Sequence, residues 1–328
     1  MTHLFAAEWA RLFSRRITIV TLVLVATAMA FLTFGYTLTG SSPTAAEKAR
    51  AEERAVSLGQ LWDQRTDRCG KVRSGLEQAE PNENFPKNCD YGARPTRDSL
   101  LDYGFSFTRQ WPSLFYGAAL LLALAGFVLG ASFVGVEWSS GGMAGLLLWA
   151  PRRSRVLGAK LLAAMAGTGL VALVYLALWT GAFLAIAAGG DTVGFTAGEF
   201  GSLALTALRV VFLAMAGTAL GFSIASIGRH TSAALGVGIS YLLLWEFGST
   251  LVFTVVETPR DYAEPYRLST YARSWLRMGL DQVQSGVEGS SLRPRFEPAW
   301  GASGVVITLV ALVIAAVAFL TMNRRDAR

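Results

Sequence analysis

The sequence predicts an all-α polytopic membrane protein with six transmembrane helices, an N-terminal interfacial helix and an extracytoplasmic domain between the first two spans. Of its 328 residues, 52% are hydrophobic and only 16% are charged, whereas a soluble domain carries about a quarter charged residues. The apolar residues gather in blocks long enough to cross a hydrocarbon core of about 30 Å. This composition excludes disordered, collagen-like and small disulfide-rich chains.

Six blocks contain the roughly 20 apolar residues that a membrane-spanning helix requires. They are residues 17–38, 114–136, 156–188, 203–227, 233–256 and 301–322. The third block is long and contains one early charge, Lys160, which predicts a helix that tilts or projects beyond the bilayer.

The fourth and fifth blocks each contain one ionisable residue, Arg209 and Glu246. Such residues need partners if they face the bundle. At ~1.5 Å per residue their depths in the membrane differ by about 6 Å, which a long Arg side chain can bridge. We predict a structural or gating ion pair between these spans; the alternative is that one of the two residues lines a substrate path.

The short loops set the orientation through the positive-inside rule. A cytoplasmic N-terminus gathers the basic residues that flank the spans on the cytoplasmic side: Arg11, Arg15, Arg16, Arg152, Arg153, Arg155, Lys160, Arg229, Arg324, Arg325 and Arg328. The short outer loop 189–201 carries Asp191 and Glu199 and no Lys or Arg. We therefore expect a multi-pass protein of the plasma membrane with both termini cytoplasmic. This asymmetry accounts for the net charge of +6 without a nucleic-acid partner.

Residues 1–16 have the pattern of an amphipathic helix. One helical face carries Leu4, Phe5, Trp9, Leu12 and Phe13, and we expect Glu8, Arg11 and Arg15 to lie off it. The Trp and the flanking Arg residues favour a helix in the inner membrane interface over a simple extension of the first span.

A polar insert, residues 39–111, separates the first two spans and is too long for a hairpin loop. Ser42 and Pro43 predict the N-cap and first residue of an amphipathic helix. Cys69 and Cys89 both fall in this insert, which the predicted topology places outside the cell, where disulfides persist. We expect a bridge worth about 3 kcal/mol in the chain-entropy model. The alternative is two free thiols, and two Cys without a nearby His make a poor metal site.

Residues 257–300 precede the last span and contain an apolar stripe at helical spacing: Tyr271, Trp275, Leu276, Gly279, Leu280 and Val283. This stripe predicts a short helix that lies at the outer membrane interface or re-enters it. A plain surface helix of the outer domain is the equal alternative.

Two glycine pairs in the predicted spans, Gly126 with Gly130 and Gly217 with Gly221, have the small-xxx-small spacing that permits close helix contact. The contact could form within one chain or between two copies. Because Gly is common in membrane helices, packing within the chain is favoured.

The chain lacks the motifs of several enzyme classes. It has no phosphate loop of the G-x-x-x-x-G-K-[ST] type, no H-E-x-x-H and no G-x-S-x-G. Its two histidines, His3 and His230, have no carboxylate at ligand spacing. We therefore expect no catalytic site, no bound metal and no cofactor on this chain.

The segment 137–155 has the densest pattern. It contains an acidic residue at the end of a span, a Gly-rich turn, a short apolar helix, a helix-breaking Pro151 and a basic cluster. A short helix held between two spans suits contact with an external partner; an ordinary inner loop is the alternative. The candidate contact residues are Glu137, Trp138, Gly141, Gly142, Met143, Leu146, Leu147, Trp149, Arg152, Arg153 and Arg155.

This segment, together with six spans, cytoplasmic termini, the N-terminal helix and the polar segment before span six, resembles the ABC-2 type transporter permeases. The resemblance covers nearly the whole chain except the insert 39–111. It implies a separate ABC ATPase subunit that carries ATP and Mg²⁺, and it gives residues 137–155 the role of a coupling segment docked in that subunit. It also implies a second copy or a related permease, and outward transport of a hydrophobic or amphipathic substrate.

Two other functions stay open from the sequence. A membrane-anchored sensor or assembly factor would use residues 39–111 to bind a ligand and would need no ATPase. An intramembrane enzyme is disfavoured, because catalytic residue types are not clustered. Stimulation of an ATPase by this chain would separate the first two functions.

Overall fold

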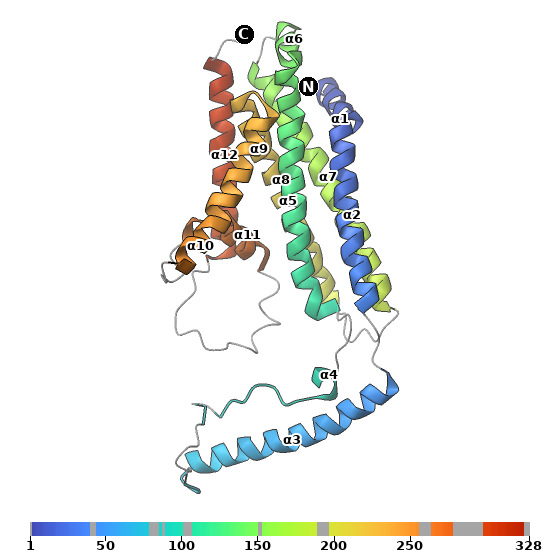
Figure 1. The fold of residues 1–328 in the computed structure, drawn as a ribbon, viewed down its shortest axis with the longest axis vertical. Helices are drawn as coiled ribbons and strands as arrows, with labels where there is room; N and C mark the ends of the chain where they lie inside the picture. The colour runs from blue at the N-terminus through green and yellow to red at the C-terminus, as the bar shows by residue number, and fades with distance from the viewer. Residues whose placement is uncertain are drawn as a thin grey trace.

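The computed structural model describes residues 2–39, 44–78, 85–86, 89–100, 107–149, 153–188, 197–255, 264–277 and 298–324, which form helices and turns without a strand. Figure 1 shows an elongated helix bundle and a separate long helix, α3, beyond one end of it. Both termini and the short helix α6 lie at the opposite end. We call the end of the bundle that faces α3 the α11 end, after the short helix α11 (Leu268–Arg277) on that side. The opposite end is the α6 end.

Six helical stretches are long and apolar enough to cross a membrane, which confirms the predicted all-α architecture. They lie in α2 (Arg16–Thr39), α5 (Phe107–Ser139), α7 (Arg153–Ala188), α8 (Ala197–Gly228), the run α9 (Thr231–Ser240), η1 (Tyr241–Phe247) and α10 (Gly248–Val255), and α12 (Trp300–Arg324). Several helices begin or end beyond the predicted limits, because hydropathy marks the apolar part of a helix and the backbone stays helical past it.

The remaining helices are not among the six spans. They are α1 (Thr2–Ser14), α3 (Ala45–Arg73), α4 (Arg97–Leu100), α6 (Gly142–Trp149), the 3₁₀ turn η3 (Glu264–Tyr266) and α11 (Leu268–Arg277).

The centre of the bundle is the crossing of α5 and α8, which is built on the two predicted glycine pairs. A Cβ on Gly130 would lie less than 3.0 Å from the carbonyl oxygen of Thr218, and one on Gly221 would lie equally close to that of Phe127. Gly126 and Gly217 meet the facing backbone in the same way. The glycines therefore serve packing within the chain, because any side chain here would force the two helices apart.

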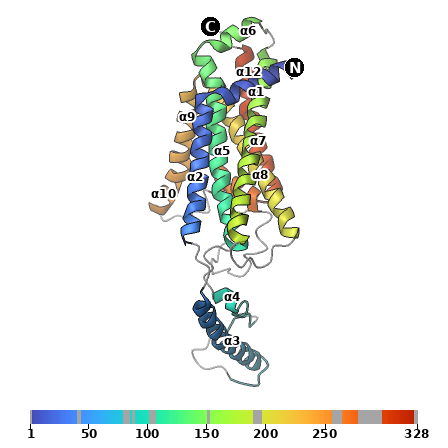
Figure 2. The ribbon, with the colours of Figure 1, turned by 90° about the vertical axis from the view of Figure 1, so that its right-hand side faces the viewer.

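An N-terminal helix distinct from the first span is present. The helical conformation is interrupted at Arg15, and Figure 2 shows α1 lying across the α6 end at a steep angle to α2. Leu12 is 2% exposed and fills the space over Gly167 of α7. The rings of Trp9 and Phe13 are 5.4 Å apart. The apolar face of α1 thus packs on the bundle through Leu12.

Two predictions about the N-terminal helix have different outcomes. The side chains of Leu4 and Phe5 lie outside the described part of the structure, so their place on the apolar face stays a prediction. The prediction that Glu8 lies off this face is wrong, because Glu8 is 1% exposed. Glu8 is one helical turn before Leu12 and shares its side of the helix.

The start of α3 differs from the prediction. Thr44 is the N-cap: its hydroxyl accepts a hydrogen bond from the Glu47 N–H, and the Glu47 carboxylate accepts one from the Thr44 N–H. This reciprocal capping box satisfies two backbone donors. The described helix is thus capped by Thr44, whereas the sequence analysis predicted Ser42 as the cap. Residues 42 and 43 themselves lie outside the described residues.

A disulfide joins Cys69 of α3 to Cys89, with their Cα atoms 5.7 Å apart. These are the two cysteines that the sequence analysis pairs. The segment 89–100 then runs back along α3, where the Arg94 guanidinium lies 2.5 Å from a carboxylate oxygen of Asp63. The bridge and the ion pair hold the return segment against a helix that has few other neighbours.

The fifth span contains a π-helical segment, η1, where the Gly248 N–H donates to the carbonyl of Leu243, five residues back. None of the η1 residues is buried, and Leu244 is 74% exposed. Such segments are rare and occur frequently at functional sites. Here the π turn places Glu246 toward α11, as the contacts below show.

Candidate functional site

The short helix α6 caps one end of the bundle in both views (Figures 1 and 2). Gly141 precedes it with φ +73°, a left-handed conformation that suits glycine and lets the chain reverse after α5. Met143 is 0% exposed and packs in a core cluster that includes Phe133 and Leu157. Leu148, in contrast, is 85% exposed. The helix therefore has one side that holds it to the bundle and another on which the apolar side chain of Leu148 is exposed.

Two other candidate contact residues, Trp138 and Leu146, pack against the bundle, whereas Gly141 and Gly142 are exposed. The Arg229 guanidinium lies 4.9 Å from the ring centroid of the half-buried Trp138. Leu146 packs, partly buried, against the same core cluster as Met143.

The residues after α6 are placed in part. The Arg153 guanidinium donates to the Met322 carbonyl at 3.4 Å, which ties the start of α7 to the end of α12. Arg155 is exposed. The side chains of Leu147 and Trp149, and all of Arg152, lie outside the described residues, so their roles stay predictions.

A charge network joins α1, the end of α5 and the start of α7. Lys160 Nζ lies 2.5 Å from Glu8 Oε2 and 2.7 Å from Glu137 Oε2. A guanidinium nitrogen of Arg15 lies 2.5 Å from Glu137 Oε1. A guanidinium nitrogen of the exposed Arg11 also lies 3.1 Å from Glu8 Oε1, so two carboxylates bind three cations. The network brings together two residues that the sequence analysis treated separately, Glu137 and Lys160.

The network is buried and further supported by the backbone. The side chains of Lys160 and Glu8 are each 1% exposed, and that of Glu137 is 13% exposed. Arg15 donates to the Phe133 carbonyl at 2.7 Å, and its guanidinium lies 4.7 Å from the centroid of the Phe133 ring. In a low-dielectric site a fully paired network fixes its members in one arrangement, whereas loss of one partner leaves an uncompensated charge.

The network fixes Glu137 between Arg15 and Lys160, and its predicted role in coupling to an ATPase stays a prediction. Glu137 stands five residues before α6 and points to Arg15 and Lys160, not away from the bundle. Sequence reasoning missed Glu8 and Arg15 as members. The signal that could have found them is Lys160 itself, since a Lys inside an apolar span requires a nearby carboxylate.

A second polar cluster lies at the α11 end, around Glu246. The carboxylate accepts hydrogen bonds from the Tyr241 hydroxyl at 2.8 Å, from the Ser269 N–H at 3.1 Å and from the Ser269 hydroxyl at 2.6 Å. The Leu268 N–H donates to the Tyr241 oxygen at 2.9 Å. Span five therefore caps the N-terminus of α11, whose free N–H groups favour a negative charge.

Arg209 contacts α11 from another side. Its guanidinium lies 5.7 Å from the Trp275 ring centroid and 5.4 Å from that of Trp300. The two intramembrane charges of the sequence analysis thus both bear on α11, Glu246 at its start and Arg209 near its end. Their direct ion pair stays a prediction.

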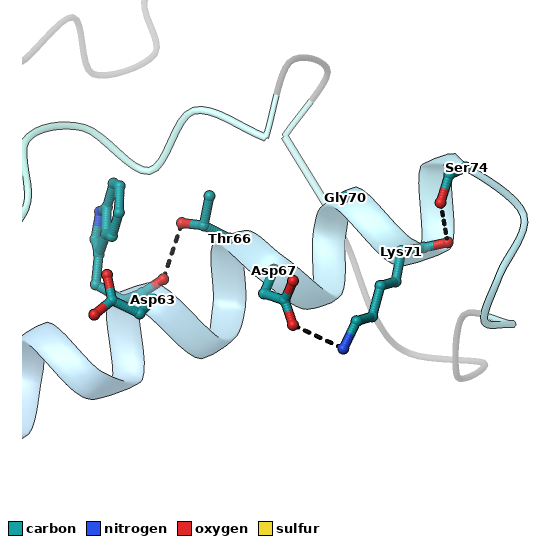
Figure 3. A pocket seen from close by; sticks show the side chains of 7 residues that line it. Asp63, Thr66, Asp67, Gly70, Lys71 and Ser74 are labelled. Carbon is teal, nitrogen blue, oxygen red and sulfur yellow. Dashed lines mark hydrogen bonds and ion pairs between the residues drawn. The ribbon is translucent and has the colours of Figure 1, made fainter.

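A shallow pocket of about 450 Å³ lies along α3. Some of its polar groups pair within the helix, as Figure 3 shows: Lys71 pairs with Asp67 at 2.8 Å, and the Thr66 hydroxyl donates to the Trp62 carbonyl. The indole N–H of Trp62 is buried without a hydrogen-bond partner. The hydrogen bond from Lys71 to Asp67 raises the pKa of Lys71. Among the described residues no group of three His, Cys, Asp or Glu side chains could hold a metal ion.

These features define a polytopic α-helical membrane protein with a short helix anchored across one end of its bundle. The chain matches the family model described as "ABC-2 family transporter protein" over residues 3–324. It therefore belongs to the ABC-2 transporter family and is a membrane permease component of an ABC transporter. The family implies an ABC ATPase as a partner. No curated protein and no solved structure matches the chain.

Proposed function

We propose that this chain is the permease subunit of an ABC exporter and that α6 docks in a separate ATPase subunit. In this assembly ATP and Mg²⁺ belong to the ATPase, and the permease contributes binding and motion. The single observation that carries the proposal is the two-sided nature of α6: Met143 is fully buried while Leu148 is 85% exposed. An exposed apolar side chain on a firmly held short helix is the kind of anchor that a protein partner's pocket receives.

The charge network supplies the route from α6 into the membrane. Glu137 lies on the α5 side of α6, and Lys160 lies on the α7 side. These two residues lie 2.7 Å apart, and each also forms an ion pair with Glu8 or Arg15. The helices α1, α5 and α7 therefore move together when the ATPase displaces α6. A ligand-driven change in the ATPase then shifts the population of permease conformations through this rigid unit.

The charge distribution supports a cytoplasmic α6 end. Basic residues that flank the spans lie at this end of the helices, among them Arg11, Arg16, Arg155 and Arg324, as the positive-inside rule expects for cytoplasmic segments. Both termini are then cytoplasmic, the disulfide-bonded segment with α3 lies outside, and the protein resides in the plasma membrane.

A second permease copy, or a related permease, completes the assembly. The apolar surface of span five supports this part of the proposal, since Leu243, Leu244 and Phe247 are 59%, 74% and 64% exposed. A hydrophobic or amphipathic substrate moves outward along or near the contact between the two permeases.

Co-purification tests the docking of the ATPase. The chain is tagged at its C-terminus, solubilised in mild detergent and analysed for bound proteins. We expect an ATPase with a phosphate-loop motif, and we expect Leu148→Asp to reduce its recovery strongly. The matched control is Leu76→Asp, since Leu76 is similarly exposed at 77% but follows α3. Equal recovery with both variants, or no ATPase with an intact and folded chain, would overturn the proposal.

The α3 pocket is the one observation that favours a sensor or assembly factor instead. Its charged groups already take part in ion pairs, Lys71 with Asp67 and Asp63 with Arg94, so the donor that it offers a ligand is the buried Trp62 indole N–H. The absence of any ATPase in the experiment above, combined with ligand binding to the α3 segment, would favour this second function.

A further inference from the structure

An aromatic cavity lies at the α11 end, between α8, α11 and α12. Its volume is about 340 Å³, and its walls include Phe212, Trp275, Trp300 and Gly304. Ligand pockets in proteins start at about 300 Å³ and are mostly apolar and aromatic, with a few placed polar groups. The cavity is thus large enough for one apolar group.

The walls of the cavity are held in place by their own contacts. The Trp275 ring centroid is 5.0 Å from that of Phe212 and 6.0 Å from that of Trp300. The Trp275 indole N–H donates to the Arg209 carbonyl at 3.3 Å. The same ring lies against Gly304, where a Cβ would come within 3.0 Å of it. A side chain at position 304 would therefore displace the wall.

A cation lies against two of these aromatic rings. The Arg209 guanidinium is within 5.7 Å of the Trp275 centroid and 5.4 Å of the Trp300 centroid. A guanidinium has five N–H donors in a planar fork that matches carboxylate and phosphate, so it accommodates an anionic group in addition to its contacts within the chain.

The cavity opens toward the side of the bundle. Trp300, Val305 and Leu309 of α12 line it and are 44%, 58% and 53% exposed. In a membrane-spanning helix this exposed apolar surface faces lipid, and Trp300 stands at the first residue of the span, the position where Trp marks the membrane interface. A molecule can thus enter from the adjacent leaflet without crossing water.

We propose that Phe212, Trp275, Trp300 and Arg209 form a binding site for an anionic amphiphile, with its apolar chain in the cavity and its carboxylate or phosphate on Arg209. The site exchanges its ligand with the leaflet at the α11 end, the side on which a substrate that moves outward leaves the protein. The inference rests on the proposed transport function and specifies its substrate class. Aromatic walls favour the apolar chain by burial, and the guanidinium discriminates anionic from zwitterionic head groups.

Spin-labelled lipids test this site directly. The full chain is placed in phosphatidylcholine nanodiscs with a trace of phosphatidylglycerol or phosphatidylcholine labelled on the acyl chain, and the motionally restricted fraction is measured by electron paramagnetic resonance. We expect restriction of the phosphatidylglycerol probe to exceed that of phosphatidylcholine, and Arg209→Gln to abolish the preference. We expect Trp300→Leu to reduce restriction of both probes.

Matched variants and a head-group competitor complete the design. Phe31→Leu removes an aromatic ring that is 74% exposed on another span, and Arg16→Gln removes an exposed cation at the opposite end; both should leave the preference unchanged. Excess inorganic phosphate should not displace the probe, because it lacks the apolar chain. If Arg209→Gln fails to fold, the reduced restriction of both probes in Trp300→Leu still tests the cavity.

No preference in the unmodified chain, a preference that survives Arg209→Gln, or undiminished restriction of both probes in Trp300→Leu would overturn the site. Leu148→Asp separates this result from the transport proposal, since it should lose the ATPase and keep the probe. Failure of ATPase docking therefore leaves lipid binding measurable, and failure of lipid binding leaves ATPase docking measurable.

Discussion

Lys160 and Glu8 form an ion pair 2.5 Å long, although 152 positions separate them in the chain and each side chain is only 1% exposed. The pair ties the N-terminal helix to the start of span three. Because Lys160 also contacts Glu137 at 2.7 Å, the two segments that flank α6 are joined through one ammonium group.

Removal of this ammonium group should destabilise the protein. Lys160→Met leaves Glu8 buried without its main partner, and we expect the free energy of unfolding to fall by about 3–5 kcal/mol. Chemical denaturation in detergent, followed by tryptophan fluorescence, measures the change. Adding Glu8→Gln to Lys160→Met should restore part of the loss. Arg155→Met, at an exposed position of the same helix, serves as the control, and equal losses at the two positions would contradict the account.

The α5–α8 crossing gives a second prediction. Gly221→Ala places a Cβ against the Phe127 carbonyl, so the helices must separate, and we expect a loss of about 1–3 kcal/mol, as for overpacked cores. Gly117→Ala is the matched control, because no heavy atom lies within 4 Å of the added Cβ. In a helix that change should be neutral or stabilising by about 0.5–1 kcal/mol. Thermal unfolding of both variants checks the difference, and a stable Gly221→Ala variant would refute the packing.

Glu246 should control the order of α11. Glu246→Gln removes the charge that caps the helix and one acceptor of the Ser269 bonds, at a cost of about 1–3 kcal/mol. Hydrogen-exchange mass spectrometry should then show faster exchange in residues 268–277 and unchanged exchange in α5. Unchanged protection of α11 would mean that the cap is not what holds this helix.

The direct Arg209–Glu246 pair has its own test. Arg209→Glu and Glu246→Arg should each abolish transport, and the double reversal should restore it if the two charges pair. Failure of that rescue would leave the two residues with separate roles on opposite ends of α11.

The cap of α3 predicts a pH effect outside the membrane. Hydrogen bonds from the backbone and side chain of Thr44 hold the pKa of Glu47 below its ordinary value of 4.5. Because the pKa of Glu47 is lower in the folded than in the unfolded protein, its ionised carboxylate stabilises the folded form at any pH above the unfolded pKa. This stabilisation is lost as the pH falls through the folded pKa. Amide exchange at the start of α3, corrected for its intrinsic pH dependence, should therefore accelerate below about pH 4. Glu47→Gln should lack this transition; a transition of equal size in that variant would assign it to another group.

The sequence predicts much of this fold because local patterns determine it. Apolar blocks locate the six spans, and a Gly-rich turn followed by a short apolar run locates α6. The aromatic and aliphatic face of residues 1–16 predicts a helix separate from span one. Such features depend on residues within a few helical turns of one another.

Other features depend on contacts that no local pattern reveals. The pairing of Glu8 with Lys160 joins distant helices, so periodicity alone misplaces Glu8. The glycine spacing shows that α5 and α8 can approach closely, but not that they approach each other. The π segment at Tyr241–Phe247 has the composition of an ordinary apolar helix, so its geometry cannot be predicted from the local pattern.

The exposed side of α6 is the centre of the functional account, and site-specific crosslinking tests it most directly. A photoreactive amino acid replaces Leu148 in one variant and Leu120, which is 62% exposed on α5, in another. Both variants are illuminated within intact membranes, and crosslinked partners are identified by mass spectrometry. The account predicts a crosslink from position 148 to an ABC ATPase and none from position 120. An ATPase crosslink at position 120 alone, or none at position 148 in a folded protein, would contradict it.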